Sequence, residues 1–144
     1  MTPQQESYLR DARVARLATV DDRGNPYVVP VCFVYEAGRI YTALDQKPKS
    51  VLPTRLRRVK NILANPGVAL LVDHYTEDWD ALSYMLVRGK ASVVEEEERG
   101  FAVAALRAKY SQYAEMLKDE ATVIVLKPGS VSSWAASGEI GKTS

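Results

Sequence analysis

The chain has 144 residues, of which 47% are hydrophobic and 26% are charged, and its net charge is +1. This balance is that of an ordinary folded protein of about one domain, and it excludes a largely disordered chain, a collagen-like repeat and a coiled coil. Because no apolar run reaches the roughly 18 residues that span a bilayer, we expect no transmembrane helix and no membrane partner.

The N-terminus and the cysteine content both indicate a cytoplasmic protein. The first ten residues are polar and lack the apolar region of a signal peptide. Cys32 is the single cysteine, so it cannot form a disulfide within the chain, and it lies in an apolar run. Both features are typical of a reducing compartment.

Taken in chain order, the sequence begins with a predicted helix and continues mainly with strands. Thr2 suits the N-cap of a helix over residues 3–13, and Gln5 completes a capping box. Pro30 interrupts a β-branched run and indicates an edge strand or a bulge. Runs rich in β-branched and aromatic residues, bounded by turn residues, predict strands over 14–20, 27–35, 39–44, 68–72, 82–94, 122–126 and 131–136.

The spacing between these runs predicts how they are connected. Short loops join the first three strands, so we expect them to form an antiparallel meander. Gly89 is a candidate β-bulge, and Pro128–Gly129 is expected to turn the chain. Two further helices are expected over 54–64 and 96–118, and the apolar stripe of the first of them consists of Leu52, Leu56, Val59 and Leu63.

These elements predict a mainly β protein with flanking helices. We expect a single domain over residues 1–144, with the N-terminal helix within 1–13 and a loose tail over 137–144. Sequential hairpins of six to seven antiparallel strands in so small a domain favour a barrel with helices packed outside it.

Positive charge is concentrated in one segment. Between Gln46 and Val72 there is no acidic residue, whereas the rest of the chain carries all eighteen acids. Such a segment suits an anionic ligand such as a phosphate, a carboxylate or a nucleic-acid backbone, or else it is a solvated helix face. Its bases are Lys47, Lys49, Arg55, Arg57, Arg58 and Lys60.

Residues that carry catalysis by themselves are scarce. His74 is the only histidine and Cys32 the only cysteine, which excludes multi-histidine and thiolate metal sites. The sequence has no glycine-rich phosphate loop and no nucleophile elbow. An enzyme with so few reactive side chains needs a cofactor, and we identify no catalytic residue from the sequence.

The order of several short segments resembles a known family. The segments are 16–20, 24–26, 28–31, 38–42, 58–66, 68–72, 87–91 and 131–134, and they cover nearly the whole chain. Together they resemble the pyridoxamine 5'-phosphate oxidase-like split barrels, which implies a split β-barrel of the FMN-binding type. The chain departs from the vitamin-B6 oxidases in lacking their longer C-terminal segment and their serine-arginine-lysine phosphate cluster.

Two segments resemble one branch of that superfamily more closely. Residues 45–49 (Asp-Gln-Lys-Pro-Lys) and 72–79 (Val-Asp-His-Tyr-Thr-Glu-Asp-Trp) look like the proteins that use the deazaflavin coenzyme F-420. The resemblance implies a cytoplasmic homodimer with its cofactor in a groove between subunits. It also implies a reductase that moves hydride from reduced F-420 to an electron-poor small molecule.

The resemblance and the basic segment together assign candidate cofactor-binding residues. The phosphorylated tail needs positively charged donors, for which Lys47, Lys49, Arg55, Arg58 and Lys60 are the candidates. The ring is expected against two strands, and Trp79, in an acidic loop, is expected to complete the pocket from the second subunit together with Tyr84, Arg88 and Trp134. The strand residues are Val29, Pro30, Val31, Tyr41, Thr42 and Ala43. Water, Tyr41, Tyr75 and His74 are alternative proton donors.

Three other functions compete with the F-420 reductase. One is an FMN-dependent oxidoreductase of the same fold, and another is a non-catalytic protein that binds a flavin or a tetrapyrrole. The third is nucleic-acid binding through residues 47–60, which we do not expect because that segment lacks the aromatic platform typical of single-strand binding. No metal is expected.

Overall fold

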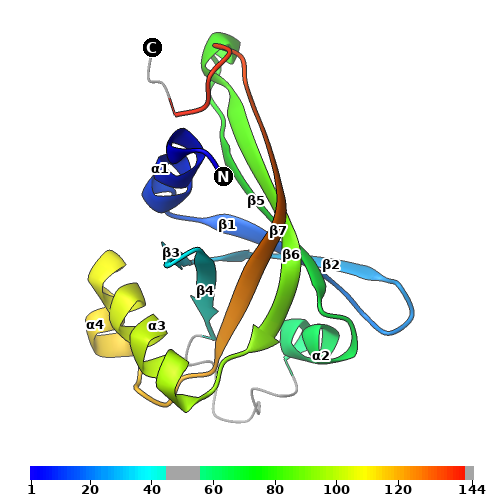
Figure 1. The fold of residues 1–144 in the computed structure, drawn as a ribbon, viewed down its shortest axis with the longest axis vertical. Helices are drawn as coiled ribbons and strands as arrows, with labels where there is room; N and C mark the ends of the chain where they lie inside the picture. The colour runs from blue at the N-terminus through cyan, green and yellow to red at the C-terminus, as the bar shows by residue number, and fades with distance from the viewer. Residues whose placement is uncertain (45–55, 142–144) are drawn as a thin grey trace.

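The computed structural model describes residues 1–44 and 56–141. In this part of the chain seven strands form one antiparallel sheet, flanked by helices (Figure 1). The elements are α1 (Pro3–Asp11), β1 (Ala15–Val20), β2 (Pro26–Val31), β3 (Val34–Glu36), β4 (Arg39–Ala43), α2 (Arg57–Ala64), β5 (Gly67–His74), the 3-10 helix η2 (Trp79–Ala81), β6 (Ser83–Val93), α3 (Glu96–Lys109), α4 (Tyr113–Met116) and β7 (Val123–Ala135).

The strands follow the order β2-β1-β5-β6-β7-β4-β3. The long strands β6 and β7 run the length of the molecule, with α2 on one side of their lower end and α3 and α4 on the other (Figure 1). The sheet curls until its two ends approach each other, since β2 and β3 are separated in the chain by Cys32 and Phe33 alone. The Thr42 hydroxyl on β4 donates a 2.7 Å hydrogen bond to the Cys32 carbonyl in this link. The mainly β split barrel with outer helices is therefore confirmed.

The predicted strand over 27–35 is in fact two strands, β2 and β3, at opposite ends of the strand order, although the expected antiparallel pairing with the strand before it and the strand after it is present. β2 pairs with β1, whereas β3 pairs with β4. The reason lies at Phe33, whose backbone N–H and C=O both bond the Tyr110 hydroxyl, at 3.1 and 2.9 Å. With these groups satisfied by a side chain, the ladder ends and the chain crosses to the other end of the sheet.

The predicted strands 122–126 and 131–136 are one continuous strand, β7, so the predicted turn at Pro128–Gly129 is wrong. β7 stays paired with β6 because the register shifts between Arg88 and Gly89, opposite Pro128. The irregularity absorbs the missing N–H of the proline, which a regular ladder would not tolerate. The bulge predicted at Gly89 is confirmed.

The helices differ from the prediction mainly at their ends. The capping box of Thr2 and Gln5 is present, and α1 ends at Asp11. The buried face of α2 contains Val59 and Ile62, while Leu63 is 65% exposed, so the predicted stripe is wrong at Leu63. The third predicted helix is shorter than 96–118, because α3 ends at Lys109 and a separate turn, α4, follows.

The buried side chains form two clusters. One fills the concave side of the sheet, and the other lies between α3, α4 and the strands β4 and β7. In the predicted tail, Ile140 is 8% exposed and belongs to the first cluster, whereas its described neighbours are exposed. The rest of the predicted tail, 142–144, lies outside the described residues. None of the helices described could cross a membrane.

Candidate functional site

The first predicted contact for a cofactor ring is the edge strand β2. It has a partner only on its β1 side, so its other edge is not paired within the sheet. Pro30 is exposed and Val29 is half-buried, whereas Val31 is buried in the first cluster. Proline suits an edge strand because it has no N–H to donate. β2 therefore exposes Val28 and Pro30 on one face, whereas Val29 packs against the first cluster from the other face.

The second predicted contact, on β4, is occupied by contacts within the protomer. The side chains of Tyr41, Thr42 and Ala43 are at most 5% exposed. The Tyr41 hydroxyl donates a 2.8 Å hydrogen bond to Glu98 on α3, and burial together with this carboxylate raises the pKa of Tyr41. Its proton is thus directed into the contact between β4 and α3, where Arg39 also binds Glu98 at 2.7 Å.

Helix α2 carries the described part of the basic segment. Arg57 and Lys60 are exposed and Arg58 is half-buried, and the helix contains no acidic residue. The helix is held against the sheet by Asn61, which is 2% exposed and donates a 2.9 Å hydrogen bond to the Thr19 hydroxyl on β1. Asn61 is therefore a packing residue of the helix.

The charge of α2 reaches the β1–β2 hairpin. Hydrogen bonds from the Asn25 backbone and side chain lower the pKa of Asp21, and the positive charge of Arg57 lowers it further. The hydrogen bond between Asn61 and Thr19 independently places α2 beside the end of β1 that leads into this hairpin. The remaining predicted donors, Lys47, Lys49 and Arg55, lie outside the described residues.

Trp79 is separated from α2 within one protomer. It is 67% exposed in η2, at the tip of the β5–β6 hairpin, whereas α2 lies at the other end of the sheet (Figure 1). Below this tip, the rings of Tyr84 and Trp134 stack with centroids 6.1 Å apart, and both are more than 40% exposed. The structure therefore places α2 against β1, next to the edge strand β2, and leaves Trp79 apart.

The exposed aromatic rings belong to what we call the outer face, which consists of Arg16, Asp73, Tyr84, Leu86, Arg88 and Trp134. Register aligns these residues across neighbouring strands β1, β5, β6 and β7. An ion pair of 3.0 Å joins Arg16 and Asp73 across β1 and β5. The ion pair was not foreseen from the sequence, because the two residues are far apart in the chain. The face itself follows from the alternation of side chains along β6, where exposed residues such as Tyr84 and Arg88 alternate with buried ones such as Met85 and Val87.

The chain belongs to the pyridoxamine 5'-phosphate oxidase family, whose sequence profile matches residues 1–135. It therefore has the flavin-binding split-barrel fold of that family. Among proteins with a curated description, none matches the chain in sequence.

Solved structures with the same fold have different described functions. A conserved hypothetical protein from Mycobacterium tuberculosis has a TM-score of 0.77 at 16% identity, over 95% of this chain and 86% of that one. A structure described as an F420 reductase has a TM-score of 0.64 at 24% identity, over 88% and 94%. HutZ, described as a heme storage protein from Vibrio cholerae, has a TM-score of 0.70 at 18% identity, over 92% of each chain.

Proposed function

We propose that this protein binds a phosphorylated flavin-type cofactor beside β2 and α2, and that its cofactor is the deazaflavin coenzyme F-420. The observation that carries the proposal is the acid-free basic face of α2, which lies near the hairpin of the edge strand β2. Membership of the pyridoxamine 5'-phosphate oxidase family supports a flavin-type cofactor, and the likeness to an F420 reductase supports the deazaflavin.

The residues of α2 fit an anionic tail. Lys60 and Arg57 are exposed donors of positive charge, and Arg58 adds a third cation on the same helix. Charge-assisted hydrogen bonds to phosphate are stronger than neutral ones, and arginine also offers a bidentate geometry. Val28 and Pro30, which share the exposed face of β2, provide an apolar surface for a planar ring, whereas Val29 packs on the opposite, core side. Lys47, Lys49 and Arg55 are proposed to extend the same site.

The proposed activity is reduction of an electron-poor organic molecule. When bound, reduced F-420 supplies the hydride, so the protein itself needs few reactive side chains. The role of this chain is to bind the two partners, orient them and exclude water. Of the candidate proton donors, Tyr41 is turned inward to Glu98, whereas His74 and Tyr75 are exposed.

The cofactor proposal is tested by titrating the protein with F-420 and, separately, with FMN, and following fluorescence. We expect F-420 to bind more tightly than FMN, and Lys60→Ala to weaken F-420 binding about 5- to 20-fold, the effect of one charge-assisted hydrogen bond. Lys118→Ala removes an exposed lysine outside this site and is expected to leave the affinity unchanged.

Each other result of the titration has a definite meaning. Tighter binding of FMN would replace F-420 by the FMN-dependent alternative. Equal effects of Lys60→Ala and Lys118→Ala would remove α2 from the site, and the absence of binding by either cofactor would overturn the proposal. A non-catalytic binding protein remains the second candidate, favoured by the likeness to a heme storage protein. Single-turnover reduction of quinones, enones and nitro compounds by the loaded protein distinguishes it from a reductase.

The protein is further proposed to act as a homodimer through its outer face. Tyr84 and Trp134 expose a stacked aromatic pair there, and exposed aromatic residues are enriched in protein interfaces. A second copy also supplies what one protomer lacks, since Trp79 lies far from α2 in its own chain. In the proposed dimer, the partner subunit therefore supplies the aromatic side of the cofactor pocket that was expected of Trp79.

The dimer is tested by sedimentation. We expect the wild type to sediment as a dimer and Trp134→Glu to shift it towards the monomer, because the substitution removes the stacked aromatic pair and adds a charge that is costly to bury. Met116→Glu is the matched control, because Met116 is 59% exposed on α4, away from the outer face. A monomeric wild type, or an equal response to both substitutions, would contradict the proposed interface.

A further inference from the structure

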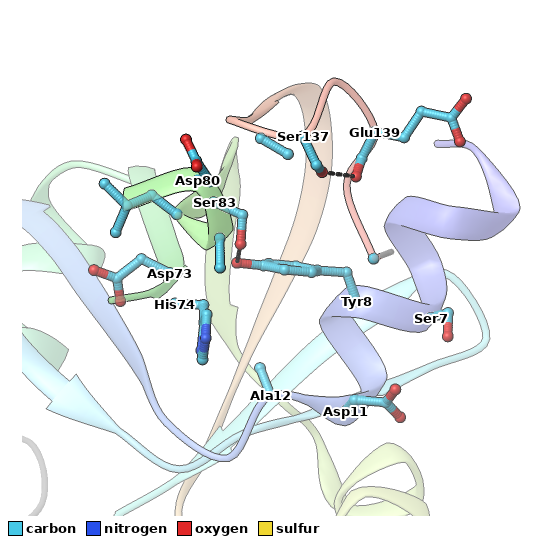
Figure 2. Close-up of a pocket in the computed structure, with 14 residues that line it drawn as sticks. Ser7, Tyr8, Asp11, Ala12, Asp73, His74, Asp80, Ser83, Ser137 and Glu139 are labelled. Carbon is cyan, nitrogen blue, oxygen red and sulfur yellow. Dashed lines mark hydrogen bonds between the residues drawn. The ribbon is translucent and has the colours of Figure 1, made fainter. Parts of the chain in front are cut away.

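A cavity unrelated to the basic helix lies at the upper end of the molecule. It is bounded by α1, by the β5–β6 hairpin with η2, and by the chain after β7 (Figure 2). Its volume of about 410 Å³ falls within the range of small-molecule pockets. The cavity therefore has the size of a ligand site, on elements different from those of the proposed cofactor site.

The interior of the cavity combines apolar walls with a polar contact. Tyr8 reaches from α1 across to β6, where its hydroxyl and that of Ser83 form a 2.9 Å hydrogen bond (Figure 2). Burial of the ring is the main reason why the pKa of Tyr8 is raised, so the phenol stays neutral. Ala12, Leu82 and Ala135 add apolar surface around this pair. The face of a tyrosine ring attracts cations.

Charged side chains around the cavity are acidic. Asp73 and Asp80 lie on one side of Tyr8, and Asp11 and Glu139 lie on the other (Figure 2). Asp73 is neutralised by Arg16 at 3.0 Å and His74 also lines the cavity, but none of the described lining residues is a lysine or an arginine. The described lining is thus negative, which disfavours an anion such as the phosphorylated cofactor.

The arrangement of these acidic residues also favours an organic cation over a metal ion as the ligand. Within the described residues, no three His, Cys, Asp or Glu side chains are grouped closely enough to hold a metal. Carboxylates spread around an apolar cavity suit a ligand with a positive group and an apolar body. We infer that this cavity binds a small organic cation, such as an amine, over Tyr8, independently of the proposed cofactor.

The test uses benzylamine as the probe, with benzyl alcohol and benzoate as neutral and anionic analogues of similar shape. Binding is followed at neutral pH and low salt by amide chemical shifts of the ¹⁵N-labelled protein. We expect benzylamine to bind with a dissociation constant on the order of 1 mM, as suits so small a ligand. The shifts should be centred on the amides of Tyr8, Ser83 and Ala135, with at least fivefold weaker binding of both analogues.

The acids are tested by the double substitution Asp11→Asn and Asp80→Asn, which removes one charge on each side of Tyr8. We expect about fivefold weaker binding of benzylamine. The control is Asp22→Asn with Glu36→Gln, which removes the same charge from exposed residues elsewhere and should leave binding unchanged. Equal affinity for benzyl alcohol, shifts centred outside the cavity, or equal effects of the two double variants would overturn the proposal.

Discussion

Replacing Gly89 by alanine is expected to lower the free energy of unfolding by about 3–5 kcal/mol, an effect of the size reserved for backbone or core disruption. A Cβ at this position would overlap the carbonyl oxygen of Lys127 and lie 2.9 Å from its carbonyl carbon. Both atoms belong to the backbone of β7, so neither can rotate away. The clash falls at the register shift that keeps β6 and β7 paired along their whole length.

Gly100→Ala is the matched control for this substitution. Gly100 is exposed within α3, and a Cβ there would meet nothing within 4 Å. Because alanine is a better helix former than glycine, we expect this variant to be more stable by about 0.5–1 kcal/mol. Urea unfolding of both variants measures the difference. A Gly89→Ala protein as stable as the wild type would show that β6 and β7 are not closely packed at Gly89.

The second large effect is a dependence of stability on pH that comes from Lys109. Its Nζ is buried without a hydrogen-bond acceptor among the described residues, and it lies 4.1 Å from the centre of the Phe33 ring. Desolvation, followed by the positive charge of Arg13, lowers the pKa of Lys109 to about 8, although Cys32 and Asp11 oppose the shift. The folded state therefore loses this proton more readily than the unfolded chain does.

The sign of the effect follows from this order of proton release. Below pH 8 both states hold the proton, and the folded state carries the full cost of a desolvated charge. Between pH 8 and about 10.5 only the unfolded chain keeps it, so the free energy of unfolding rises with pH. After allowance for solvent screening, we expect a rise of about 1 kcal/mol between pH 7 and 9.5.

The contribution of Lys109 is isolated by comparison with Lys109→Met. We expect the rise in unfolding free energy to be absent in this variant and retained in Lys118→Met, whose lysine is exposed. The range stops at pH 9.5 because the pKa of Tyr110 is raised by burial, so tyrosine titration opposes folding at higher pH. Parallel pH profiles for wild type and Lys109→Met would show that the ammonium group is hydrated in the folded protein.

The candidate site could be predicted only in part. The basic residues of α2 could be predicted because a run without acidic residues can be read directly from the sequence, whatever the fold. Tyr41 and Thr42 were expected beside a ligand, but the sequence could not show that Glu98 and Cys32 occupy their hydroxyls. The cavity at Tyr8 was not predicted, because its wall is assembled from three segments far apart in the chain.

Local patterns in the sequence were sufficient to determine the β-rich composition, the capping box of α1, the bulge at Gly89 and the family of the fold. These features depend on residue type, on spacing over a few positions, or on segments in a fixed order. Only the tertiary structure decided that 27–35 divides between two ends of the sheet and that β7 continues through Pro128. Both outcomes depend on distant partners, the Tyr110 hydroxyl and the register of β6, which satisfy backbone groups that a local pattern leaves unassigned.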